Sequence, residues 1–213
     1  MSCPICAKRK PGRFCPAKGE KICAVCCGTE REVTLDCPAD CPHLKAARRY
    51  EDEQRKPEPA ELPFSDVTLS SEIVYERQAI LAGLALAVVQ AAARHEPLND
   101  ADALAALRAL AETYKTLLTG IYYQRPPDAP LPRALYEELA GFLKEAREEE
   151  AKRAGFATTK DSEVFHLLVF LLRLASFHTN GRPRSRRFLQ FLRSQFAQQP
   201  SKAAPEVSRI VLP

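Results

Sequence analysis

The sequence predicts a mainly α-helical protein that begins with a small cysteine-rich module and continues into a helical bundle. All eight cysteines of the 213-residue chain lie within its first 41 residues, and three prolines interrupt the chain between residues 57 and 63. Beyond them, apolar residues recur at helical spacing without strand-like alternation. We therefore expect a module with a trailing helix at 1–56, a proline-rich linker at 57–64, a bundle at 65–200 and a C-terminal tail at 201–213.

The cysteine spacing is typical of metal ligands. Two residues separate the cysteines in Cys3–Cys6 and in Cys23–Cys26, and three separate those in Cys37–Cys41. A tight turn of this kind directs both sulfurs toward one ion, and structural zinc takes four tetrahedral ligands. Eight thiolates therefore predict two Zn²⁺ ions.

The simplest division gives the first ion the two pairs of cysteines that are separated by two residues, so that the ligands of the two ions alternate along the chain. The first set is Cys3, Cys6, Cys23 and Cys26. The second set is Cys15, Cys27, Cys37 and Cys41, with His43 as the alternative to Cys27. A sequential division, with Cys15 joining the first ion in place of Cys26, stays open at this point.

Short secondary-structure elements should carry the ligands. The segments 12–16 and 19–23 have the character of two strands joined by a turn around Gly19. A helix is expected after Cys41, and the four-residue step from Cys37 to Cys41 suits the first turn of a helix. The expected module is a hairpin and a helix held together by zinc.

The segment from Cys3 to Cys41 resembles the treble-clef and cross-brace zinc fingers, a group that includes RING, B-box and HIT-type fingers. The strings Cys26–Glu32 and Cys37–Cys41 are similar to those of bacterial zinc-binding proteins of unassigned function. The resemblance implies a type of module and no particular activity.

The cysteines are expected to be reduced. A disulfide framework would belong to an oxidising compartment, but Lys8, Arg9 and Lys10 leave no room for the apolar stretch of a signal peptide. A cytoplasmic location is therefore expected. Oxidation of zinc thiolates with release of the metal is kept as an alternative, regulatory role.

The charge of the module depends on its metal. Residues 1–50 carry ten basic and five acidic side chains. Eight thiolates and two divalent ions add four net negative charges, which brings the loaded module to about +1. Much of the basic character then offsets thiolate charge, which weakens the assignment of the module to nucleic-acid binding.

About five helices are expected after the linker. Their approximate ranges are 71–95, 100–123, 133–154, 161–178 and 183–198. The fourth is apolar nearly all round and should lie at the centre of the bundle. No apolar run reaches the roughly 20 residues needed to cross a bilayer, so no membrane association is expected.

A basic segment without acidic residues extends from 164 to 205. Its arginine loop consists of Arg182, Arg184, Arg186 and Arg187. These side chains stand at the start of a helix, where the dipole favours an anion and disfavours arginine. The loop is therefore predicted either to bind an anion, nucleic acid included, or to form ion pairs with Glu148–Glu150.

The sequence contains no complete catalytic constellation. The spacing Glu163-x-x-His166 occurs once, whereas a carboxylate-bridged metal pair needs a second such motif. The preferred hypothesis is a non-enzymatic zinc-binding protein that acts in interaction or regulation, with a protein partner expected and nucleic acid as the alternative. An enzyme that acts on an anionic substrate through His166, His178 and the arginine loop is the other alternative. The oligomeric state is left open.

Overall fold

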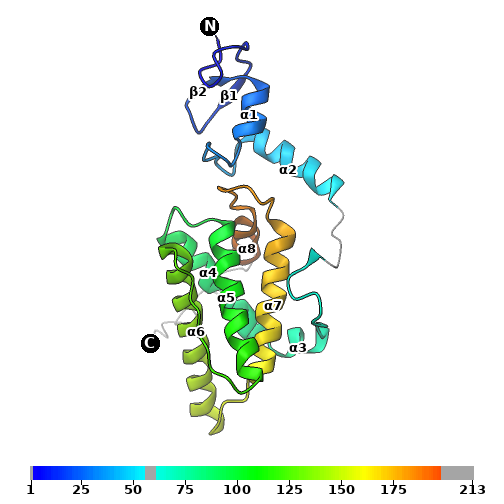
Figure 1. Cartoon of the computed structure of the whole chain (residues 1–213), viewed down its shortest axis with the longest axis vertical. Helices are drawn as coiled ribbons and strands as arrows, with labels where there is room; N and C mark the ends of the chain where they lie inside the picture. Colours follow the sequence, from blue (N-terminus) through cyan, green and yellow to red (C-terminus); the bar gives the residue numbers. More distant parts are fainter. Residues whose placement is uncertain (1, 56–60, 198–213) are drawn as a thin grey trace, which may run out of the picture.

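The structure is a computed structural model that describes residues 2–55 and 61–197 (Figure 1). Its described residues form eight helices and two short strands, so the protein is mainly helical as predicted. The cysteine-rich module lies at one end of the helical bundle. The expected tail at 201–213 and most of the linker, 57–60, lie outside the described residues.

The module contains the predicted hairpin. Strands β1 (Arg13–Cys15) and β2 (Glu20–Ile22) are antiparallel, with Phe14 opposite Lys21. Gly19 has a φ of 68° in the turn between them, a conformation that glycine adopts without steric cost. Cys15 lies opposite Glu20, at the end of the hairpin that carries the turn.

Both helices of the module begin at a cysteine. Cys23 is the N-cap of α1 (Ala24–Glu30), and its sulfur accepts a hydrogen bond from the Cys26 amide at 3.3 Å. Cys41 directly precedes α2 (Pro42–Gln54), whose first residue is a proline that needs no amide partner there. Cys37 lies in the irregular loop before α2, and the prediction that it belongs to the first helical turn was wrong.

The bundle consists of six helices. They are α3 (Ser71–Glu76), α4 (Gln78–Arg94), α5 (Asp100–Leu118), α6 (Pro130–Ala154), α7 (Asp161–His178) and α8 (Arg187–Ala197). The single helix predicted for 71–95 is broken at Arg77, which has φ −103° and ψ 22°. Its guanidinium donates to both oxygens of Glu163, at 3.1 and 3.2 Å. Of the other four predicted helices, the one at 161–178 has the predicted bounds, and the other three are present with one or both ends shifted.

Helix α7 is the central helix, as its apolar character predicted. It packs against α3, α4, α5 and α8, and its Leu167, Leu168 and Val169 are completely buried. Helix α6 covers the other side of α4 and α5, where Gly83 leaves space for the ring of Phe142. Within the described residues, no helix has both the length and the apolar character needed to cross a membrane.

Candidate metal centre

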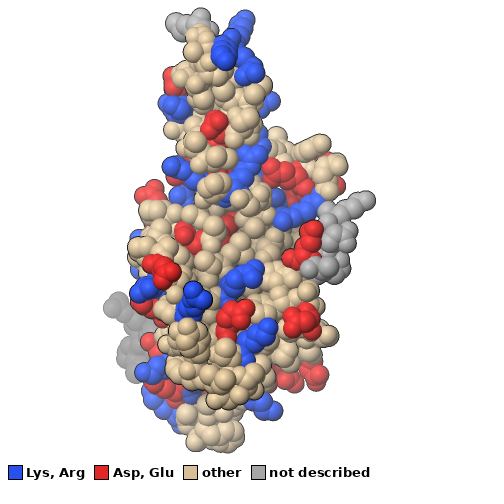
Figure 2. Space-filling model, in the orientation of Figure 1, with Lys and Arg blue, Asp and Glu red and all other residues tan. Residues whose placement is uncertain are grey.

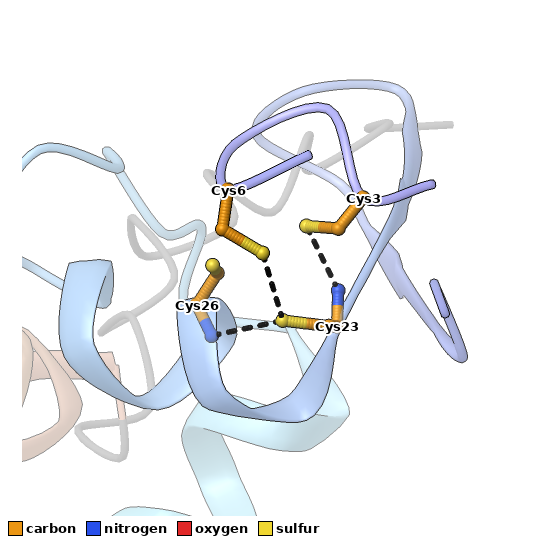
Figure 3. Close-up of side chains that lie close together, drawn as sticks. All are labelled: Cys3, Cys6, Cys23 and Cys26. Atoms are coloured by element: carbon orange, nitrogen blue, oxygen red, sulfur yellow. Dashed lines mark hydrogen bonds between the residues drawn. The ribbon is translucent and has the colours of Figure 1, made fainter. Parts of the chain in front are cut away.

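The sulfur atoms of four cysteines meet at the end of the module that is farthest from the bundle (Figure 3). They belong to Cys3, Cys6, Cys23 and Cys26, and all four lie within 4.8 Å of one another. The first pair comes from the N-terminal turn and the second from the start of α1. The structure thus gathers the residues of the predicted first site, and Cys15 is not among them.

Backbone amides point at these sulfurs. The amide of Cys23 donates to the sulfur of Cys3 at 3.3 Å, and the amide of Cys26 donates to that of Cys23 at the same distance. Burial alone would raise the pKa of the Cys3 thiol, but hydrogen bonds from the amides of Cys23, Cys6 and Ile5 lower it. Such donors stabilise the thiolate, which is the form that binds a metal ion.

The pKa values of two thiols in this group are shifted in opposite directions. Hydrogen bonds from the amides of Lys8 and Arg9 lower the pKa of Cys6 to about 6. Burial, together with the neighbouring thiols, raises the pKa of Cys26 to about 12. Four thiolates at this separation repel one another unless a cation lies among them. Four soft sulfur donors form a ligand set that suits a metal ion such as zinc.

The other four cysteines are separate from the first group and line a small cavity of about 10 Å³. Its lining includes Cys15, Cys27, Cys37, Cys41 and His43. These residues come from β1, from α1, from the loop after α1 and from the start of α2. Among the described residues, only the first group has its ligand atoms within 4.8 Å of one another. All the candidates for the second site therefore share one cavity, but their donor atoms do not converge as closely.

Glu32 links the second group of cysteines to the bundle. Its amide donates to the sulfur of Cys37. Its side chain is only 2% exposed and accepts hydrogen bonds from Arg48 at 2.6 Å and Asn180 at 2.8 Å. Its carbonyl oxygen accepts from the amide of Arg184 at 2.8 Å. The φ of Glu32 is 54°, a left-handed conformation that is uncommon for a residue with a side chain and that these contacts hold in place.

The arginine loop contacts the cysteine-rich module. Arg182 donates to two carbonyl oxygens at the end of α1, at 3.0 and 2.6 Å. Arg186 makes two hydrogen bonds to Asp36, at 3.0 and 3.3 Å. The predicted ion pairs with Glu148–Glu150 are not formed in the described structure, because the module presents nearer carboxylates to the loop.

The remaining arginines of the loop differ from each other. Arg187 pairs with Glu51 and Asp52 on α2. The side chain of Arg184 is exposed. Three of the four guanidinium groups are therefore engaged in joining the module to the bundle, and anion binding by the loop stays a prediction.

The carboxylate of Asp100 lies at the start of α8, where the helix dipole favours an anion and disfavours the arginines of the loop. This carboxylate is completely buried and accepts hydrogen bonds from the Ser185 hydroxyl at 2.7 Å and from the Arg187 amide at 2.9 Å. It also accepts from the amides of Phe188 and Leu189. A carboxylate in this position caps a helix and offsets its dipole. The sequence pattern identified Asp100 only as the start of α5, because its partners lie more than 80 residues away.

The structure does not bring His166, His178 and the arginine loop into one cleft. His166 lies 2.7 Å from the carbonyl oxygen of Ser162, and His178 stacks on Phe191 with ring centroids 3.8 Å apart. The two histidines stand twelve residues apart on α7, about 18 Å along a helix. Glu163 is bound by a guanidinium between α3 and α4 and joins no metal-binding group among the described residues.

These features define a class of protein: a helical protein with an N-terminal four-cysteine group that could hold a metal ion. A scan against protein-family models, a search of curated proteins and a search of solved structures each found no significant match.

Proposed function

We propose that the protein is a non-enzymatic zinc-binding protein that acts in interaction or regulation, with two Zn²⁺ ions folding its cysteine-rich module. The observation that carries this proposal is the group formed by Cys3, Cys6, Cys23 and Cys26. Four thiolates complete a tetrahedral shell and leave no position for water or a substrate, which is the arrangement of structural zinc sites. A module of this size buries too little apolar surface to be stable by itself, and the bound ion would supply the missing stability.

The second ion is proposed for the cavity between β1, α1 and α2. Its ligands would be Cys15, Cys37 and Cys41, with Cys27 or His43 as the fourth. A volume of about 10 Å³ is too small for an organic ligand, since such ligands occupy several hundred Å³. An ion in this cavity would tie the hairpin to both helices of the module, which the short β1–β2 pair alone cannot do.

The contacts between module and bundle support an interaction role. Buried Glu32 and three arginines of the loop fix the module on one end of the bundle. The opposite end of the module faces away from the bundle (Figure 1). A module that is fixed on the bundle and has an exposed far end is suited to presenting a surface to a partner.

Paired substitutions test the proposal. The zinc content of purified Cys23→Ser and Cys37→Ser should each fall by one ion per chain, because each change removes a ligand from a different site. Helicity measured by circular dichroism should change little, since α3–α8 bury their own core. Ser2→Ala is the matched control and should keep full zinc content. Unchanged zinc in either cysteine variant would show that the ligand assignment is wrong.

A further inference from the structure

The N-terminal turn and the hairpin of the module expose six basic side chains and one aromatic ring, which also lines the cavity of the second cysteine group. We call this region the distal basic surface: Lys8, Arg9, Lys10, Arg13, Lys18 and Lys21, together with Phe14. Phe14 is 55% exposed, and all six cations except the half-buried Arg13 are exposed. Figure 2 shows lysine and arginine on the end of the molecule that carries the module, with a few acidic groups between them.

The acidic residues of the module are concentrated elsewhere. Residues 2–26 contain six basic residues and one acidic residue, Glu20. Glu32 and Asp36 lie at the junction with the bundle and are bound there by arginines. Five thiolates, Cys15 included, and one divalent ion contribute three negative charges, so residues 2–26 of the loaded module keep a net charge of about +2. The near-neutral charge of the whole module therefore conceals a separation between a positive far end and a negative junction.

The cations of the distal basic surface have few internal partners. In the part of the chain that the structure describes, their one ion pair joins Lys18 and Glu20 at 4.0 Å. By contrast, Arg182 and Arg187 of the arginine loop are bound to the module. Exposed cations without an internal partner can be neutralised by an external polyanion.

The first metal site fixes the position of part of this surface. The amides of Lys8 and Arg9 donate to the sulfur of Cys6, and the carbonyl of Arg9 accepts from the amide of Cys3 at 2.8 Å. The turn that carries these two cations is thus built around ligands of the site. Metal binding at the four thiols would therefore order the cations that follow Cys6.

We propose that the distal basic surface binds single-stranded nucleic acid. Its cations contact the phosphates, and Phe14 stacks on an unpaired base. A nucleic acid is a regular polyanion that also offers flat rings, which matches a positive surface with an exposed aromatic side chain. The inference rests on the proposed function, because the zinc site orders the turn that holds Lys8 and Arg9.

The geometry favours a single strand over a duplex. Phe14 lies on a two-stranded hairpin opposite Lys21, and a base must be unstacked to reach its ring. A duplex is read in the major groove by a helix or by a two-stranded ribbon, and β1 and β2, with three residues each, form only a short ribbon. Helix α1 has seven residues, and its first turn is occupied by the metal-binding thiols.

Fluorescence anisotropy with a labelled oligothymidylate of about 20 nucleotides tests this inference on the zinc-loaded full chain. With about four phosphates contacted, affinity should fall about 50-fold between about 50 and 200 mM salt. Replacing Lys8, Arg9 and Lys10 with glutamine should reduce the salt slope by about 2 units. Phe14→Ala should weaken binding by about tenfold and leave the salt slope unchanged.

The matched control replaces three exposed cations of α6 with glutamine: Lys144, Lys152 and Arg153. This control should bind as the parent chain does. The zinc content of every sample is measured alongside the titration. A failure to bind zinc can then be distinguished from a failure to bind nucleic acid. A parent chain that holds its zinc but does not bind at about 50 mM salt would overturn the inference. Tighter binding to a duplex of the same length, or to an acidic peptide, would also overturn it.

Discussion

Arg48 and Glu32 form an ion pair with a nitrogen–oxygen distance of 2.6 Å, and their side chains are only 15% and 2% exposed. The same guanidinium also donates to Gln190 on α8. One arginine of α2 thus joins the loop beside the second cysteine group to the bundle. This relationship makes the junction sensitive to single substitutions, because removal of either charge leaves the other buried without its partner.

Glu32→Ala should destabilise the docked structure by about 3 kcal/mol, since Arg48 and Asn180 would both lose their acceptor. The free energy of unfolding in urea, followed by circular dichroism, measures the effect. Glu53→Ala, at an exposed position on α2, is the control and should change stability by less than about 0.5 kcal/mol. Equal effects of the two substitutions would contradict a structural role for the buried pair.

Asp100→Ala should destabilise the bundle by about 3 kcal/mol, because the Ser185 hydroxyl and the first amides of α8 lose a buried acceptor. Ser185→Ala should cost about 1 kcal/mol. The double variant should be less destabilised than the sum of the two, since the residues share one network. Thermal unfolding measures all three, and Asp128→Ala at an exposed position is the control. Additive effects would argue against direct coupling.

Arg182→Ala should loosen the module from the bundle, whereas Arg184→Ala should not. The side chain of Arg182 donates to the end of α1, and that of Arg184 is exposed. Hydrogen exchange of the amides at the end of α1 measures the difference, with exchange at least about tenfold faster in the Arg182 variant. Similar exchange in the two variants would contradict the contacts assigned to the arginine loop.

Acidification should weaken the contact between α7 and α8. Burial, reinforced by the nearby Arg187, lowers the pKa of His178 below its ordinary value of 6.5. The folded state then binds a proton less readily than the unfolded state does. The contribution of His178 to the free energy of unfolding is fully present above about pH 6.5. It falls as the pH drops toward the lower pKa that His178 has in the folded state.

Comparison of His178→Gln with the parent chain isolates this effect. The urea midpoint of the parent should fall more between about pH 7.5 and 5.5 than that of the variant. Protonation of the zinc ligands affects both chains equally and cancels in the difference. Gln90→Ala, at an exposed position of α4 without a titratable group, serves as the control and should keep the parent's dependence.

Local signals in the sequence predicted much of this structure. The two-residue cysteine spacings identified Cys3–Cys6 and Cys23–Cys26 as one group, because each pair lies within a few residues. The helix predicted for 100–123 begins at Asp100 as expected, and there the side chain of Asn99 accepts the amides of the first helical turn. Both are features whose partners lie close together along the chain.

Long-range partners account for what the sequence pattern missed. Arg77, at the break between α3 and α4, is bound by Glu163, which is 86 residues away. The contact of Arg186 with Asp36 spans 150 residues. Charge and periodicity in a single sequence do not specify which distant side chains meet. For the same reason, Glu148–Glu150 were named as one alternative partner of the arginine loop, and the module was not.

The most direct test of the central claim is the number of zinc ions held by one chain. Native mass spectrometry of the untagged protein, purified without chelator, should give a mass increase of two zinc ions per chain. Acidification should release both, because protons compete for the thiolates. A chain that carries less than about one zinc ion, and that keeps the same helicity and module contacts after treatment with chelator, would contradict the account.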